Sequence, residues 1–317
     1  MTFFNRIDPM VRLLVLAIAL ALALPVRGEA REAAQWIANA AVFLLFFLNG
    51  VRLPRHEVAA GLGNHRLLVP LTLWCFGGMA LVGWGLWQAG QGWMPPLIAL
   101  GFLYLGCLPS TVQSATAYSS LAGGNVASSV VAAALLNLFG VFITAPLFSL
   151  LGGGGAAGFN GDALLKVVLI LLVPFMLGQM MQGRFAGCVK DNRQLTVWFD
   201  RASIAIAVYV AFSGAVEQRF WERVDPVGWA WLLGGVTLLL IVGHWGAWLL
   251  GRLVKLDRPD QVSMLFAGGQ KSIAMGAPLA SVLFAPAVAG VVLLPILIYH
   301  LAQLVLAAPL AARLNRI

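Results

Sequence analysis

Apolar stretches about as long as a lipid bilayer is thick recur along the whole sequence, separated by short charged or Gly/Pro-containing segments. Because a helix needs about 20 apolar residues to cross the hydrocarbon core, these stretches predict transmembrane helices. Only 10% of the 317 residues are charged, whereas soluble domains carry about 25%. The sequence therefore predicts an all-α polytopic membrane protein.

Ten stretches of this kind predict ten transmembrane helices joined by short loops. They span residues 10–26, 34–50, 66–88, 95–121, 125–151, 162–183, 198–216, 228–252, 260–284 and 287–311. No connecting segment is long enough to separate folding domains. We therefore expect residues 1–317 to form a single transmembrane unit.

The first stretch has a second interpretation. Arg12 precedes an apolar run, and Ala21-Leu22-Ala23 resembles a signal-peptide cleavage site. We favour a first transmembrane helix, because the rest of the chain is predicted to be embedded in the membrane.

Basic residues are distributed unequally between the two sides that this helix count defines. If the N-terminus lies inside, the inner segments contain fourteen of the twenty Lys and Arg residues, the outer segments five, and Lys271 lies within a span. Cytoplasmic segments carry such an excess. The asymmetry therefore predicts ten spans with both termini cytoplasmic, and it explains the net charge of +8 without binding to nucleic acid.

A full charge lies in the middle of the ninth stretch, at Lys271, where residues 268–278 read GGQKSIAMGAP. A charge at membrane depth costs roughly 2.5–3.5 kcal/mol on insertion scales, so it marks a cavity, a partner or a bound solute. The surrounding glycines and Pro278 weaken the helix and free backbone groups. We expect a broken helix with a binding site at the break.

The fourth stretch contains a similar interruption, at residues 106–114, which read GCLPSTVQS. It is the fourth of the first five helices, as the Lys271 segment is the fourth of the second five. Paired interruptions in matching positions of inverted halves indicate the binding site of a transporter. We therefore expect two inverted repeats, 1–155 and 156–317, although ordinary kinks are the simpler alternative.

Lys271 has several possible roles. It can carry a proton, pair with an anionic solute, or act as a fixed cation in place of a metal ion. The alternative is a structural lysine that binds carbonyls freed at the break.

The other candidate ligands of a solute or ion are neutral or titratable polar groups near the two interruptions. They are Gln113, Ser114, Thr116, Asn125, Ser129, Gln270, Ser272, His300 and Gln303. Asn125 follows two glycines and is as much a candidate helix cap as a ligand. His300 and Gln303 share a helix face, where they line the cavity or bond between helices.

Signatures of other functions are absent from the sequence. The three cysteines are far apart, and there is no HExxH, GxSxG or GxxxxGK[ST] motif. We expect neither an enzyme nor a bound cofactor or metal centre. Asp200-Arg201, at the expected start of a helix, is interpreted as an interfacial ion pair with a capping role.

Five segments together resemble the bile acid:sodium symporter family, in its SBF-like branch. They are FLLFFLNGVRLPRHEV (43–58), GCLPSTVQSATAYSSLAGGNVASSVV (106–131), DRASIAIAVYVAFS (200–213), FAGGQKSIAMGAP (266–278) and LPILIYHLAQLVLAAPL (294–310). The resemblance implies ten helices in two inverted five-helix repeats. It also implies a panel domain of helices 1, 2, 6 and 7 beside a core domain in which broken helices 4 and 9 cross.

The sequence departs from the sodium-driven members that it resembles. Their helix-nine glutamate corresponds to a position near Phe266, and two further ligands correspond to Ala115 and Ala133. A residual sodium site would use Ser114, Ser129 and Gln270. Because the ammonium of Lys271 would repel sodium, we expect classical two-sodium coupling to be lost. Proton coupling through Lys271, or uncoupled transport, would replace it.

These observations predict a secondary transporter of an organic anion or related small solute, working by alternating access in the bacterial inner (plasma) membrane. Membrane lipid and the solute are the expected partners, and Na+ or H+ is the possible coupling ion. One alternative is a sodium-coupled symporter with altered ligands. A non-transporting membrane regulator or scaffold is another, in which Lys271 only locks the core.

Overall fold

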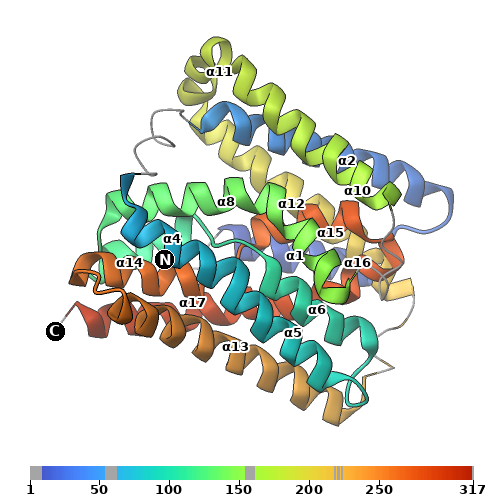
Figure 1. Ribbon diagram of the computed structural model, residues 1–317. Helices are drawn as coiled ribbons and strands as arrows, with labels where there is room; N and C mark the ends of the chain where they lie inside the picture. Colours follow the sequence, from blue (N-terminus) through green and yellow to red (C-terminus); the bar gives the residue numbers. More distant parts are fainter. Residues whose placement is uncertain are drawn as a thin grey trace, which may run out of the picture. The chain divides into compact units, whose positions relative to one another are not determined.

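The computed structural model describes residues 9–53, 63–153, 161–217, 219, 222 and 224–315 (Figure 1). All regular secondary structure elements of these residues are helical, and the described part of the chain contains no β-strand. The predicted all-α class is therefore confirmed.

The helices follow one another with short connections. In the first part of the chain they are α1 (Pro9–Ala23), α2 (Glu29–Arg52), α4 (His65–Leu73), the π-helical turn η2 (Trp74–Gly78), α5 (Met79–Gly90), α6 (Pro96–Cys107), α7 (Gln113–Leu121), α8 (Val126–Phe148) and the π-helical turn η3 (Ser149–Gly153). In the second part they are α10 (Gly161–Val167), η4 (Val168–Leu172, π-helical), α11 (Val173–Asp191), α12 (Arg193–Glu217), α13 (Pro226–Leu253), α14 (Arg258–Gly269), α15 (Ile273–Leu283), α16 (Pro286–Val292) and α17 (Leu294–Leu314).

Seven helical stretches among the described residues are long and apolar enough to cross a membrane. They are Glu29–Arg52, His65–Gly90, Val126–Gly152, Leu165–Asp191, Arg193–Glu217, Pro226–Leu253 and Ala287–Leu314. Of the other expected spans, 10–26 corresponds to the shorter helix α1, and 95–121 and 260–284 are interrupted. A membrane protein is therefore supported, and the count of ten spans stays a prediction.

Both expected interruptions are present. Helix α6 ends at Cys107 and α7 begins at Gln113, while α14 ends at Gly269 and α15 begins at Ile273. Leu108 has an extended backbone, with φ −76° and ψ 150°, which is the conformation that a following proline imposes. Pro109 therefore determines where the first interruption begins.

Two helix boundaries differ from the expected ones, one near acidic residues and one near a proline. Helix α2 begins five residues before the predicted position 34, because Glu29 and Glu32 in its first turn interact favourably with the helix dipole. The last predicted helix, 287–311, is divided at Leu293. Pro295 lies just after this turn and cannot donate a backbone hydrogen bond.

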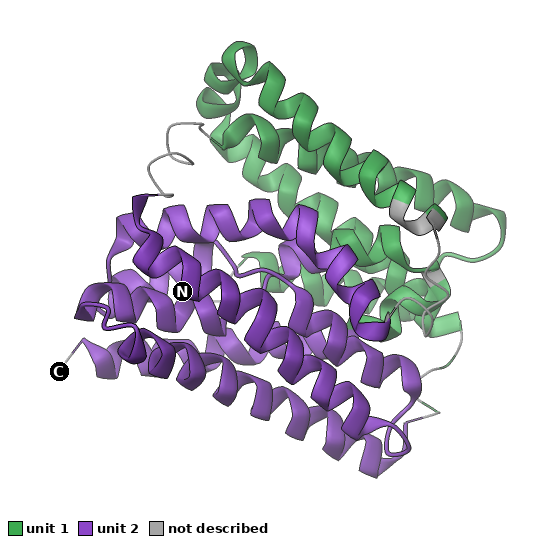
Figure 2. Cartoon of the chain, viewed as in Figure 1, with its two compact units in different colours: residues 1–53, 157–223, 277–293 green, residues 54–156, 224–276, 294–317 purple. Residues whose placement is uncertain are grey.

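The chain divides into two compact units, each assembled from separate parts of the sequence (Figure 2). Unit 1 contains residues 1–53, 157–223 and 277–293, and unit 2 contains residues 54–156, 224–276 and 294–317. The division between repeats 1–155 and 156–317 stays a prediction.

Within unit 1, α2 packs along α11, and α12 packs against α1, α2 and α16. The backbones of α2 and α11 approach closely, since a Cβ on Gly50 would lie 2.2 Å from the Phe175 carbonyl oxygen. Glycine permits such contact between membrane helices. Helix α1 buries Leu14, Ala17 and Ala21, which agrees with a structural helix.

Asp200 in unit 1 does not cap a helix, contrary to the capping role predicted from the sequence. Helix α12 begins at Arg193, so Asp200 lies inside the helix. Its carboxylate accepts two hydrogen bonds from Arg52 on α2, and Arg201 instead lies over the ring of Trp198. The helix begins earlier because Asn192 ends the preceding helix and leaves only a single-residue turn.

We expect Arg52→Met to destabilise the protein by about 1–3 kcal/mol, because the largely buried Asp200 carboxylate loses its partner. The thermal midpoint of the purified protein in detergent should fall accordingly. Adding Asp200→Asn should recover part of this loss. The exposed pair Arg219–Glu222 provides the control, and Arg219→Met should leave the midpoint unchanged. Equal effects of the two arginine substitutions would contradict the prediction.

Within unit 2, α5 packs along α6, and α13 packs along α14. A Cβ on Gly106 would lie 2.6 Å from the Met79 carbonyl oxygen, and a Cβ on Gly83 would lie 2.5 Å from the Phe102 carbonyl oxygen. The backbones of α5 and α6 are therefore in direct contact next to the first interruption.

Candidate functional site

The two interruptions lie against each other in unit 2. The backbone N–H of Ser272, in the second interruption, donates to the carbonyl oxygen of Pro109, in the first, at 2.9 Å. Segments 163 residues apart in sequence are thereby joined by a backbone hydrogen bond. This meeting point is the candidate functional site.

Lys271 reaches from the second interruption into the first. Its Nζ donates to the carbonyl oxygens of Cys75 at 3.0 Å, Gly106 at 2.9 Å and Leu108 at 2.6 Å. The side chain is fully buried. Because an ammonium group has three N–H donors, these contacts use all of them.

The groups around Nζ are dipoles and not carboxylates. Gly106 and Leu108 belong to the C-terminal end of α6, where the helix dipole is negative and favours a cation. Cys75 lies in the π-helical turn η2. No salt bridge found among the described residues involves Lys271. Its charge is therefore balanced by carbonyl oxygens.

Side chains of α17 hold the backbone of the second interruption. Gln303 accepts a hydrogen bond from the Lys271 N–H at 2.9 Å and donates to the Lys271 carbonyl oxygen at 3.1 Å. Its Nε2 is also 2.9 Å from Nδ1 of His300. The Tyr299 hydroxyl donates to the Gly269 carbonyl oxygen at 2.5 Å. Polar groups freed by the break are thus paired internally.

Gln270 connects the interruptions through its side chain. Its Oε1 accepts hydrogen bonds from Thr111 at 2.7 Å and from Ser114 at 2.5 Å. Thr111 also accepts a hydrogen bond from the backbone N–H of Ala115, in the first turn of α7, at 3.2 Å. The Nε2 of Gln270 is buried and has no partner among the described residues. It is a free donor next to the crossing of the two segments.

The other predicted site residues do not all lie at the meeting point of the two interruptions. Ser272 accepts the Met275 N–H at 3.2 Å and caps α15. Gln113 lies exposed at the start of α7. The hydroxyls of Thr116 and Ser129 are buried without a partner among the described residues. The structure therefore brings only part of the predicted set into the crossing.

Asn125 lies away from the crossing. It caps α8 by accepting the Ser128 N–H at 3.1 Å, and it donates to the Asp260 carboxylate at 2.9 Å. Asp260 is ten residues before Gln270 on α14, which is about 15 Å along a helix. The carboxylate also accepts from Asn64, the cap of α4. The capping role considered for Asn125 is therefore observed, and its role as a ligand stays a prediction.

Several residues of this site were missed from the sequence. Thr111, Asn137 and Tyr299 all bind the interruptions, Asn137 by donating to the Ser110 carbonyl oxygen at 2.8 Å. Asn137 is the single asparagine within α8, a largely apolar helix, which was an available signal. Outside the crossing, Asp260 was also missed, although it ends an Asp-x-x-Asp helix start in which Asp257 caps α14.

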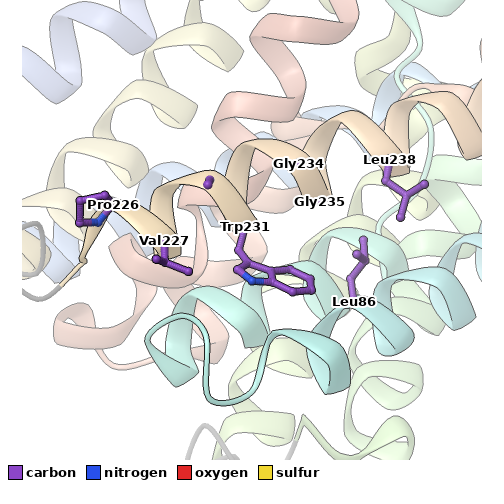
Figure 3. A pocket seen from close by; sticks show the side chains of 8 residues that line it. Leu86, Pro226, Val227, Trp231, Gly234, Gly235 and Leu238 are labelled. Atoms are coloured by element: carbon purple, nitrogen blue, oxygen red, sulfur yellow. The ribbon is translucent and has the colours of Figure 1, made fainter.

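Two hollows in unit 2 lie apart from these residues. The larger, of about 500 Å³, is an open apolar groove formed by α5 and α13 (Figure 3). It is lined by Leu86, Pro226, Val227, Ala230, Trp231, Gly234, Gly235 and Leu238. The smaller, of about 200 Å³, includes Asn64 and Ser128. No predicted site residue lines either hollow.

Comparison with known proteins supplies the family. The model of the SBF-like CPA transporter family matches residues 8–316. The chain belongs to the SBF-like CPA transporter family. It is also 37% identical to Uncharacterized protein PA2026 of Pseudomonas aeruginosa, over 96% of this chain and 91% of that protein.

Two further relatives have names that refer to transport. The chain is 36% identical to "Putative symporter YfeH" of Escherichia coli (strain K12), over 100% of this chain and 95% of that protein. It is 23% identical to Sodium/bile acid cotransporter 7 of Rattus norvegicus, over 86% of this chain and 82% of that protein. The predicted family is confirmed, and with it a membrane transporter family of sodium/bile acid symporter type.

Proposed function

We propose that this protein is a secondary transporter of an organic anion or related small solute, which binds near the crossing of the two interrupted segments and moves by alternating access. The observation that carries the proposal is the hydrogen-bonded meeting of the two interruptions in a member of a transporter family. Interrupted helices that meet inside a transporter commonly form its binding site.

Three features support an anionic solute. Helices α7 and α15 begin directly after the interruptions, and the N-terminal end of a helix attracts negative charge. Gln270 adds a buried N–H donor without a partner. Lys271 contributes its positive charge through space, because its three donors are occupied by carbonyl oxygens. The polar ligands that we propose are Gln113, Ser114, Thr116, Gln270 and Ser272.

The proposed architecture is ten spans in two inverted five-helix repeats. Unit 1 contains the proposed panel helices α1, α2, α11 and α12 together with residues 277–293, and unit 2 contains most of the proposed core. The matching positions of the two interruptions, in the fourth segment of each half, support this architecture. The protein would lie in the bacterial inner membrane with both termini cytoplasmic.

We propose that transport does not use the two-sodium mechanism. The place of the expected glutamate is near Phe266, which is buried against the ring of Tyr118. Ser114 and Gln270, two of the three residual ligands, are hydrogen-bonded to each other. Proton coupling and uncoupled transport both fit this arrangement. In a proton-coupled mechanism, Lys271 would be the group that carries the proton.

A regulator or scaffold without transport activity is the second candidate. It is favoured by one observation, namely that every N–H of the Lys271 ammonium binds the protein itself. In that function Lys271 only holds the core together.

Uptake into proteoliposomes tests these proposals. Organic anions that raise the thermal midpoint of the purified protein are selected first and then offered under imposed sodium or proton gradients. We expect uptake that is unchanged when sodium is replaced by potassium. Uptake that depends on sodium alone would contradict the proposed coupling. The absence of uptake for every stabilising anion would favour the scaffold.

A further inference from the structure

Three backbone carbonyl oxygens surround the Lys271 ammonium. We propose that the carbonyls of Cys75, Gly106 and Leu108 form a binding site for a monovalent cation of the ammonium type, which the protein fills with its own Lys271. This carbonyl site holds the two interruptions together without an ion from solution. The inference concerns the cohesion of unit 2 and does not depend on which solute is transported.

The three carbonyl acceptors around Nζ fit a charged lysine side chain better than a neutral one. A neutral amine has two N–H donors and one lone pair, so one of the three oxygens would face that lone pair. An ammonium group donates to all three. The oxygens lie 3.0, 2.9 and 2.6 Å from Nζ, within or just below the ordinary range for N–H···O bonds. The carbonyl site is therefore complementary to a positively charged nitrogen.

The polarity of the surroundings also favours a cation. Gly106 and Leu108 contribute carbonyls from the C-terminal end of α6, where about half an elementary negative charge resides. Calcium and similar metal ions bind oxygen at about 2.3–2.6 Å, which is closer than two of the three contacts here. The spacing thus fits an ammonium group better than a smaller metal ion.

The carbonyl site is held by the backbone itself. Pro109 keeps Leu108 extended, so that its carbonyl leaves the direction of helix α6. Gly106 is in backbone contact with α5, since a Cβ there would lie 2.6 Å from the Met79 carbonyl oxygen. Met79 follows the π-helical turn that contains Cys75. These contacts keep the three oxygens together when the lysine side chain is shortened.

Chemical rescue tests the proposal. Lys271→Ala removes the ammonium and leaves space for methylammonium, and we expect its thermal midpoint in detergent to fall by roughly 5–10 °C. Methylammonium chloride should restore most of this loss in a saturable manner. Tetramethylammonium chloride, which has no N–H donor, should not do so at equal concentration. Lys190→Ala, at an exposed position, should respond equally to both salts.

A second variant and a second readout make the outcome decisive. Lys271→Met retains side-chain bulk in the space, so methylammonium should not stabilise it. If Lys271→Ala is not folded when purified alone, it is purified with methylammonium throughout, and recovery of monodisperse protein only under that condition supports the carbonyl site. Equal behaviour of Lys271→Ala in the two salts, or aggregation in both, would overturn it.

Discussion

Replacing Gly178 by valine is expected to disrupt unit 1 more severely than any other single substitution considered for it. A Cβ on Gly178 would lie 2.2 Å from the Phe47 carbonyl oxygen and 3.0 Å from the Val51 nitrogen. Both are backbone atoms of α2, which cannot rotate away. Overpacking a core typically costs about 1–3 kcal/mol of stability. Because the new side chain on α11 would collide with the backbone of α2, we expect the loss of stability in Gly178→Val to reach or exceed that range.

The same helix provides the matched control. Gly187, also on α11, has no heavy atom within 4 Å of its ideal Cβ, and valine there has the same helix propensity as at position 178. Gly187→Val should therefore keep the yield of monodisperse protein and the thermal midpoint in detergent, whereas Gly178→Val should lower both. Equal midpoints for the two variants would show that α2 and α11 do not pack through these glycines.

Gln303→Leu is expected to have the second large effect, on the second interruption. The amide of Gln303 pairs with both the N–H and the carbonyl oxygen of Lys271, and all of these groups are fully buried. Leucine has a similar size but leaves both backbone groups without partners. Each unpaired buried group costs about 1–3 kcal/mol, so we expect a loss of about 2–5 kcal/mol.

Gln113→Leu is the control for this prediction, because Gln113 is exposed at the start of α7. Thermal unfolding in detergent should separate the two variants clearly. Hydrogen exchange provides a local readout, since amides around Lys271 should exchange faster in Gln303→Leu. Unchanged exchange around Lys271 in that variant would show that Gln303 does not hold the interruption.

Local chemistry determined much of the fold. Apolar stretches of about 20 residues have few alternatives to a membrane-spanning helix, because backbone groups inside a bilayer must be paired within the segment. The interruptions at Pro109 and at Gly268-Gly269 were also predictable, since glycine and proline act on their own backbone and on the preceding residue. The π-helical turns had no comparably clear signal, whereas the division at Leu293 is followed by Pro295.

The tertiary structure decided what the polar groups of those segments do. The sequence showed that Lys271 needs a compensating partner, but the candidates included a solute, a proton and carbonyls. Only packing brings Cys75, Gly106 and Leu108 to its nitrogen. In the same way, packing brought Asp260 of α14 to the side-chain amide of Asn125, a partner that the sequence did not indicate.

The physical reason is the range over which each effect acts. Hydropathy and backbone preference are properties of a residue and its neighbours in sequence, so the chain itself determined where helices form and where two of them break. Hydrogen-bond partners of a buried charge come from segments that are distant in sequence, here 163 to 196 residues from Lys271. Those distant partners were assigned only when the helices packed together in unit 2.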